Sequence, residues 1–143
     1  PEKKEATFEL FENFILTNVY DCIISEYVLT EIDATKNNEK KELLYGVINK
    51  YPIRILEIDN KKNEILELAN RYIESRVIPE KKLLDALHVA VCTVYGINIL
   101  VSWNFKHLAN INKEYRIKSV NYQNLYFNDL RIITPLELID YGN

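Results

Sequence analysis

The chain has 143 residues, of which 48% are hydrophobic and 27% are charged. This length and hydrophobicity supply enough apolar side chains for one compact core, which excludes disorder as the main state. With only 3 Gly and 4 Pro, the chain lacks the many tight turns of a β-sandwich and favours long helices. The formal net charge of −3 excludes a general positive field, so a nucleic-acid partner would need a local patch or a metal ion.

Apolar spacing and turn residues predict alternating helices and strands along the chain. In chain order these are a helix at 2–16, a strand at 20–24, a helix capped by Ser25, a helix at 39–50, a strand at 53–58, a helix that follows Asp59 and ends near 77, a helix at 83–95, a strand at 97–103, a helical turn at 105–109, a weak helix at 111–123, a strand at 131–133 and a last helix that begins at Pro135.

This alternation predicts a mostly parallel sheet with helices on both faces. The strand at 97–103 is apolar along its length, as expected of a parallel strand that is covered on both faces. No repeat, linker or domain boundary is visible. We therefore predict a single α/β domain over residues 1–143, a three-layer α/β/α sandwich with a mostly parallel central sheet. In such sheets, functional sites form at the carboxyl ends of the strands.

The cysteines and the apolar runs indicate the cellular compartment of the protein. Cys22 and Cys92 each lie within an apolar run, which favours two buried thiols in a reducing compartment over a disulfide or a zinc site. No apolar run approaches the ~20 residues of a membrane span, and no signal segment opens the chain. We expect a cytoplasmic protein with no membrane partner.

Two carboxylates stand on helix faces that should be apolar, where an unpaired charge would be costly. Glu31 lies four residues after Tyr27 and three after Val28, so it is expected on their inward face; the alternative is a side chain that reaches the edge or pairs with an Arg. Asp85 lies early in the most apolar helix, with Lys82 before it. There the alternative is an ordinary helix cap or ion pair.

Asn104 completes a possible site, because it ends the strand at which an α/β site would form. His88 and His107 are more often structural than catalytic in such settings. The chain has no Gly-rich phosphate loop and no nucleophile motif. What remains is an oxygen-donor set of Glu31, Asp85 and Asn104, which suits a hard cation such as Mg²⁺ or Mn²⁺.

From about Pro1 to Ile139 the chain resembles the PIN-domain family, the nuclease fold of VapC-type toxins from toxin-antitoxin pairs. Four segments carry the resemblance, and their order and spacing are more specific than any one of them. They are Ser25-Glu26-Tyr27-Val28-Leu29-Thr30-Glu31, Leu84-Asp85-Ala86-Leu87-His88-Val89-Ala90, the segment from Ile99 through Ser102-Trp103-Asn104 to Leu108, and Ile132-Ile133-Thr134-Pro135.

The resemblance implies a metal-dependent endoribonuclease that cleaves single-stranded or looped RNA. Glu31 and Asp85 would hold Mg²⁺ or Mn²⁺ directly or through water, Asn104 would be a neutral ligand or orient a water, and Ser102 would support the site as a hydrogen-bond donor. The cations expected to contact phosphate are Lys81, Lys82 and Lys106. The resemblance also implies a homodimer and an antitoxin partner that inserts an Arg into the acidic pocket.

Two departures from the family pattern matter. PIN proteins open with a central strand that ends in Asp, and nothing before Glu2 supplies it; Asn104 also stands where the family usually has Asp. We therefore expect the natural protein to begin upstream of Pro1, and we expect a gap in the sheet between the segments at Cys22 and Leu100. The alternative function is a catalytically impaired PIN-fold module that binds nucleic acid or another partner.

Overall fold

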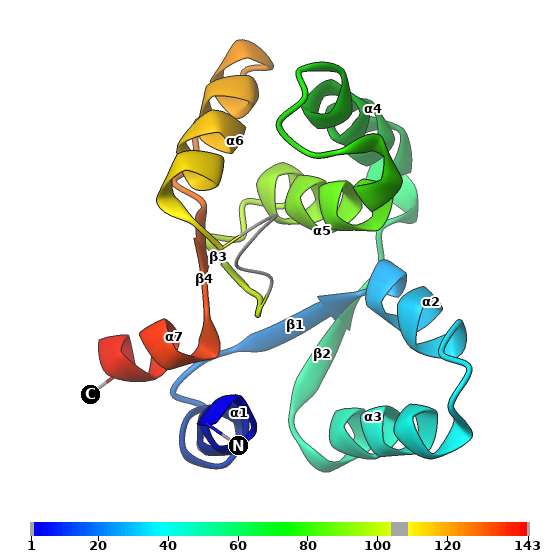
Figure 1. The fold of residues 1–143 in the computed structure, drawn as a ribbon, viewed down its shortest axis with the longest axis vertical. Helices are drawn as coiled ribbons and strands as arrows, with labels where there is room; N and C mark the ends of the chain where they lie inside the picture. The colour runs from blue at the N-terminus through cyan, green and yellow to red at the C-terminus, as the bar shows by residue number, and fades with distance from the viewer. Residues whose placement is uncertain (1, 104–108, 143) are drawn as a thin grey trace. The chain divides into compact units, whose positions relative to one another are not determined.

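The computed structural model describes residues 2–103 and 109–142 and shows a mixed α/β protein (Figure 1). Its elements in chain order are α1 (Glu2–Glu9), the π-helix η1 (Leu10–Ile15), β1 (Cys22–Ser25), α2 (Glu26–Asp33), α3 (Asn38–Lys50), β2 (Ile53–Leu56), the 3₁₀ helix η2 (Asp59–Lys61), α4 (Lys62–Glu74), the 3₁₀ helix η3 (Glu80–Lys82), α5 (Leu83–Val94), β3 (Ile99–Val101), α6 (Ile111–Gln123), β4 (Arg131–Ile133) and α7 (Pro135–Gly142).

The chain divides into two compact units. The first consists of Pro1–Glu57 and Leu136–Asn143, and the second of Ile58–Pro135. The sequence shows no linker at these boundaries, and the single domain over residues 1–143 stays a prediction.

In the first unit, β1 and β2 form a parallel pair, with Cys22 opposite Ile53 and Ser25 opposite Leu56. Parallel neighbours need a crossover, and α2 and α3 supply it between these strands. Ser25 ends β1 and caps α2, because its Oγ accepts a hydrogen bond from the backbone N–H of Tyr27 at 3.2 Å. The strand at 20–24 and the Ser25-capped helix are thus confirmed, with the strand shifted to Cys22–Ser25.

Aromatic contacts join the start and the end of the chain within this unit. The rings of Phe14 and Tyr20 stack with their centroids 5.6 Å apart, and the Tyr20 hydroxyl donates to the backbone oxygen of Leu138 at 2.8 Å. Gly142 is required here, since a Cβ at this position would lie 2.4 Å from a ring carbon of Phe14. These contacts hold α7 against the segment that follows η1.

In the second unit, α4 and α5 pack side by side, and α6 also contacts α4 (Figure 1). β3 and β4 form a parallel pair with Leu100 opposite Ile132. α5 is buried along most of its surface, as its apolar sequence predicts. The fully buried apolar side chains of this unit include Ile58, Ile65, Leu68, Tyr72, Ile78, Val89, Ile117 and Leu130.

Gly96 lies two residues after the end of α5. Its φ is +68°, a left-handed conformation that a residue with a Cβ rarely adopts, and its N–H donates to the backbone oxygen of Thr93 at 3.2 Å. This turn ends the helical part of the chain, and β3 begins three residues later.

Two expectations about the sheet differ from the structure. The strand predicted at 97–103 is shorter, Ile99–Val101, and the expected cover on both faces is wrong, because Ile99 and Val101 are exposed while Leu100 is half-buried. Among the described residues the strands form two two-stranded parallel sheets, β1 with β2 and β3 with β4. The three-layer sandwich and the gap expected between Cys22 and Leu100 stay predictions. No helix in the described ranges combines the length and apolarity that crossing a membrane requires.

Candidate functional site

Glu31 lies in α2, which the Ser25 cap places directly after the carboxyl end of β1. The structure corrects its expected orientation: Glu31 is exposed, and the buried residue of α2 is Ile32. The face that packs inward is therefore centred one position further along the helix than the spacing from Tyr27 indicates.

Asp85 lies in the first turn of α5, after the 3₁₀ helix η3. It is half-buried, while the neighbouring Ala86 and Leu87 are buried. The unpaired N–H groups at a helix N-terminus favour a negative charge there, and Lys82 lies one turn before it.

The third expected ligand falls outside the described residues, since Asn104 and His107 both lie in the interval 104–108. The structure describes the residues that precede this interval. The N–H of Ser102 donates to the backbone oxygen of Ile133 at 2.9 Å, which continues the pairing of β3 with β4. Ser102 and Trp103 are half-buried, as is His88 on α5. The predicted phosphate contacts Lys81 and Lys82 are exposed and half-buried, and Lys106 is outside the described residues.

The donor atoms of the expected set fit a hard divalent cation, and their convergence on one ion stays a prediction. Glu31 belongs to the first unit and Asp85 to the second. Within residues 2–103 and 109–142 there is no group of three or more His, Cys, Asp or Glu that could hold a metal ion. The expected set contains only two carboxylates beside an amide oxygen, so it would not form such a group. Carboxylate and amide oxygens are nevertheless the ligands that Mg²⁺ accepts.

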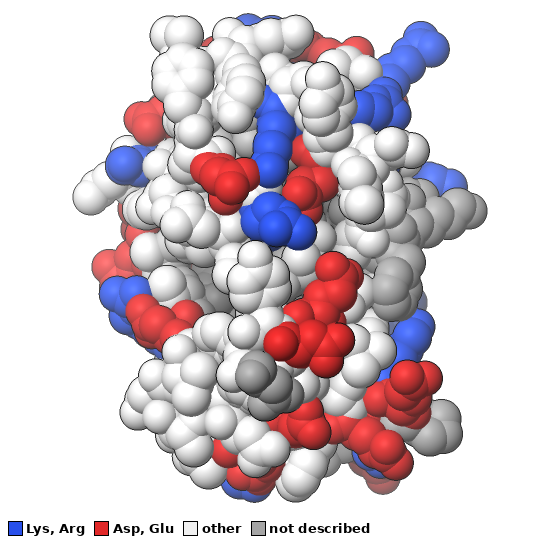
Figure 2. Space-filling view, turned by 90° about the vertical axis from the view of Figure 1, so that its left-hand side faces the viewer, with Lys and Arg blue, Asp and Glu red and all other residues white. Residues whose placement is uncertain are grey.

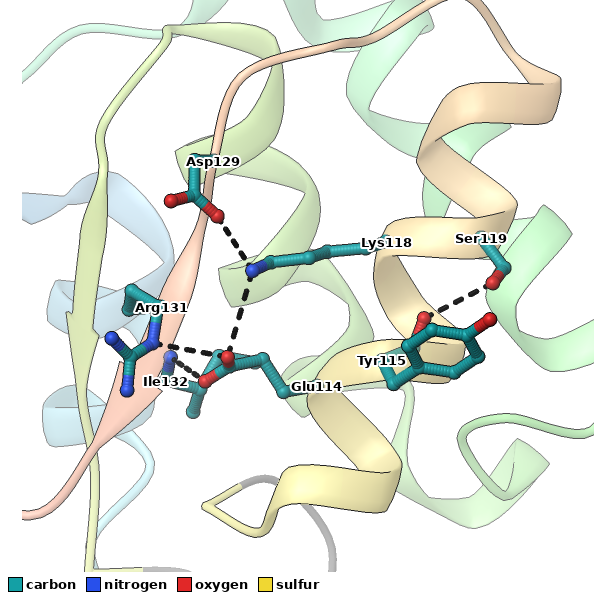
Figure 3. Close-up of polar contacts among 7 residues, drawn as sticks. All are labelled: Glu114, Tyr115, Lys118, Ser119, Asp129, Arg131 and Ile132. Carbon is teal, nitrogen blue, oxygen red and sulfur yellow. Dashed lines mark hydrogen bonds and ion pairs between the residues drawn. The ribbon is translucent and has the colours of Figure 1, made fainter.

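Glu114 in α6 is a largely buried carboxylate outside the predicted site, with a side chain that is 16% exposed. Glu114 in α6 accepts hydrogen bonds from Nε of Arg131 at 3.1 Å and from the backbone N–H of Ile132 at 2.8 Å, and it lies 3.6 Å from Nζ of Lys118 (Figure 3). Lys118 also binds Asp129 at 2.6 Å. Each charge has a partner of opposite sign, so this cluster is structural. Its signal in the sequence is Glu114 three residues before the buried Ile117.

The strongest pKa shifts belong to the core and not to a catalytic group. Burial raises the pKa of the Cys92 thiol to about 12. Burial likewise raises the pKa of Tyr72, whose hydroxyl lies among the side chains of Thr93 and Asn121. Both groups stay protonated at neutral pH, which suits packing and not nucleophilic or acid-base chemistry.

Comparison of the chain with family models, with curated proteins and with solved structures found no match. The resemblance to PIN domains therefore depends on the motifs in the sequence alone.

Proposed function

We propose that the protein is a Mg²⁺- or Mn²⁺-dependent endoribonuclease with a PIN-like three-layer fold, acting in the cytoplasm as the toxin of a toxin-antitoxin pair. One observation carries the proposal: each motif carboxylate lies on a helix, as the resemblance implies, although Glu31 is exposed and not directed inward as expected. Glu31 is on the helix that Ser25 starts at the end of β1, and Asp85 is in the first turn of the buried helix α5. The parallel pairing of all four strands supports the same fold class.

The roles follow from the positions of the side chains. Glu31 and Asp85 would bind the ion through carboxylate oxygens, Asn104 through its amide oxygen, and Ser102 would orient a ligand by hydrogen bonding. The bound ion would lower the pKa of a water and stabilise the leaving oxygen at phosphorus. A phosphodiester would approach Glu31 from solvent, because this side chain is exposed. Lys81 and Lys82, just before α5, would bind the negatively charged phosphate.

A second candidate is a PIN-fold module that binds nucleic acid or a partner without cleavage. Asn104 at the position where the family usually carries Asp favours it, because an amide contributes no negative charge to hold the ion.

The proposed partners are RNA, an antitoxin and a second copy of the chain. An antitoxin Arg would pair with Glu31 and Asp85, because a planar guanidinium can bridge two carboxylates. Such an Arg would occupy the ligands of the ion and so block cleavage. This partner controls the proposed enzyme and does not change its chemistry.

Cleavage of a fluorescein-labelled single-stranded RNA in Mn²⁺, with an EDTA control, tests the enzyme. We expect Glu31→Gln and Asp85→Asn each to slow cleavage at least about 100-fold, since second-sphere and ligand changes at metal sites typically cost 10–100-fold or more. The matched controls Glu39→Gln and Asp59→Asn alter exposed carboxylates outside the motifs and should cleave at the wild-type rate.

The outcomes separate the two candidates. Cleavage that persists in EDTA, or in both motif variants, contradicts the metal-dependent nuclease. RNA binding without cleavage by the wild-type chain in Mn²⁺ favours the binding module. The melting temperature of Asp85→Asn without metal gives an independent check. If Asp85 is a metal ligand that Glu31 repels in the metal-free protein, Asp85→Asn should be as stable as the wild type or more stable. If Asp85 forms a structural ion pair, Asp85→Asn should be less stable.

A further inference from the structure

Large apolar side chains are exposed along the outer side of α6 and in the turn after it, within the second unit. Ile111, Tyr115 and Tyr122 are 87%, 72% and 51% exposed, and their spacing places them on one face of the helix. The backbone N–H of Leu125 donates to the backbone oxygen of Tyr122 at 3.1 Å, and Leu125 is 76% exposed. With Phe127, whose ring centroid lies 5.9 Å from that of Tyr122, these side chains form what we call the α6 stripe.

The opposite side of α6 already packs within the second unit. Its buried residues are Ile117, Val120 and Asn121, and Nζ of Lys113 on this side donates to the backbone oxygen of Val77. A helix at the surface of a globular domain needs only one apolar face, the one that covers the core. The α6 stripe is a second apolar face, and a contiguous exposed apolar surface marks an interaction site.

The charged residue within this face is neutralised inside its own unit. Lys118 lies between Tyr115 and Tyr122 along the helix, and its side chain is only 22% exposed, with Nζ 2.6 Å from Asp129 and 3.6 Å from Glu114. Figure 3 shows Lys118 and Glu114 directed toward β4, with Tyr115 on the side turned away from that strand. In the upper part of Figure 2, basic and acidic side chains lie next to one another among uncharged ones. An identical surface can therefore approach without bringing two uncompensated like charges together.

The side chains along this face have the same order in both chain directions. From Ile111 to Leu125 the order is aliphatic, ring, lysine, ring, aliphatic, in steps of four, three, four and three residues. An antiparallel second copy, related by a two-fold axis near Lys118, would place Tyr115 of one chain opposite Tyr122 of the other and Ile111 beside Leu125. Rings would meet rings and aliphatic side chains would meet aliphatic ones, which is the self-complementarity that a two-fold interface requires.

The area of the α6 stripe matches the needs of a dimer. Burying a large aromatic side chain removes roughly 150–250 Å² from solvent, and an aliphatic one removes somewhat less. Scaled by the exposed fractions, in which Phe127 counts 67%, the stripe offers on the order of 600 Å² per chain. A dimer would then bury about 1,200 Å² in total, which is the lower end of the range for specific interfaces.

We propose that the α6 stripe binds the α6 stripe of a second copy of the chain in antiparallel orientation, around a two-fold axis near Lys118. The symmetric order of the side chains favours a second copy, because an unrelated apolar partner would require no such order. The inference rests on the proposed function in one respect: a second copy is named there as a partner, and the α6 stripe is the surface that binds it.

Sedimentation velocity of the full chain at about 1–100 μM tests the interface. We expect the wild type to dimerise and Tyr115→Glu and Tyr122→Glu each to raise the dimer Kd at least about tenfold, because the interface would bury an unpaired carboxylate. Tyr115→Phe keeps the ring and should dimerise within about twofold of wild type. Tyr141→Glu alters an equally exposed ring in α7, outside the stripe, and should dimerise like the wild type. Circular dichroism melts check that each variant is folded.

Disulfide cross-linking tests the antiparallel orientation. Tyr115→Cys and Tyr122→Cys are prepared separately, mixed and oxidised under mild conditions. We expect a covalent dimer in the mixture and none in either variant alone, since position 115 lies opposite position 122 of the second copy. The wild type, which keeps Cys22 and Cys92, shows any cross-linking by the native thiols. Covalent dimers of each variant alone would indicate a parallel pairing and overturn the proposal.

The outcomes separate this interface from the proposed function. A wild type that stays monomeric over the whole concentration range overturns both the α6 interface and the proposed second copy, whereas RNA cleavage is measured independently. A dimer that persists in folded Tyr115→Glu and Tyr122→Glu overturns only the α6 interface, because the second copy then binds elsewhere. Loss of the dimer in these variants and not in Tyr141→Glu supports the interface, even where Glu31→Gln cleaves RNA at the wild-type rate and the proposed catalytic site fails.

Discussion

A buried polar network shows how single residues set the stability of the second unit. The Tyr72 hydroxyl donates to Oδ1 of Asn121 at 2.5 Å and lies 3.3 Å from the Thr93 hydroxyl, to which Nδ2 of Asn121 donates at 3.2 Å. All three residues are buried. The network joins α4, α5 and α6, and each polar atom is costly to leave without a partner.

Tyr72→Phe should therefore lower the free energy of unfolding by about 1–3 kcal/mol, because it leaves a buried amide oxygen without its donor. Urea denaturation measures the change. Tyr115→Phe removes a hydroxyl from an exposed ring and should change the free energy of unfolding by less than about 0.5 kcal/mol. Equal effects of the two substitutions would show that the network contributes no more than an exposed hydroxyl.

At the scale of elements, Glu114 connects α6 to β4. Its side chain is only 16% exposed. One carboxylate oxygen accepts from the backbone N–H of Ile132, and the other accepts from Arg131. Among the described strands, β4 pairs only with β3. The backbone N–H of Ile132 points away from β3 and has no partner in the sheet, so the Glu114 carboxylate accepts its hydrogen bond.

Glu114→Ala should destabilise the protein by about 1–3 kcal/mol, because it leaves the N–H of Ile132 without an acceptor and the charge of Arg131 without its carboxylate partner. Glu114→Gln keeps an acceptor and loses only the charge, so its cost should be smaller, and added salt should narrow its difference from wild type. The control Glu67→Gln removes an exposed helical pair with Arg71 and should cost less than about 0.5 kcal/mol. If Glu114→Ala and Glu114→Gln had the same free energy of unfolding in urea, the hydrogen bond to Ile132 would make no measurable contribution to stability.

For the whole molecule, the buried thiol predicts how stability depends on alkaline pH. The Cys92 pKa is about 12 in the folded chain, against 9.0 for an exposed thiol. Above pH 9 the unfolded chain loses this proton while the folded chain keeps it. The unfolded state then binds fewer protons, and stability falls as pH rises toward 12, by at most about 1.4 kcal/mol per pH unit for this group. Cys92→Ala should be less stable than wild type at pH 7, and this deficit should shrink between pH 9 and pH 11 in urea denaturation. A constant deficit would mean that the thiol ionises equally in both states.

Local patterns in the sequence were sufficient to place most elements. The helix at 111–123 and the strand at 131–133 have the predicted bounds, and the Ser25 cap forms as predicted. Such features depend on residues that are close in the chain: a hydroxyl two residues before an N–H, or apolar side chains at helical spacing. For the same reason the sequence alone placed Glu31 and Asp85 on their helices.

Features that depend on neighbours distant in the chain were decided only by the tertiary structure. Glu31 is exposed because packing turned Ile32 inward, and a helical period by itself does not fix which of two adjacent positions is covered. Strand pairing is equally non-local: β3 pairs with β4, about thirty residues further along the chain, and Ile99 and Val101 are exposed on a strand whose composition predicts burial. The bonds of Glu114 to β4 arise in the same way, since no local pattern tells a carboxylate which strand will lie beside it.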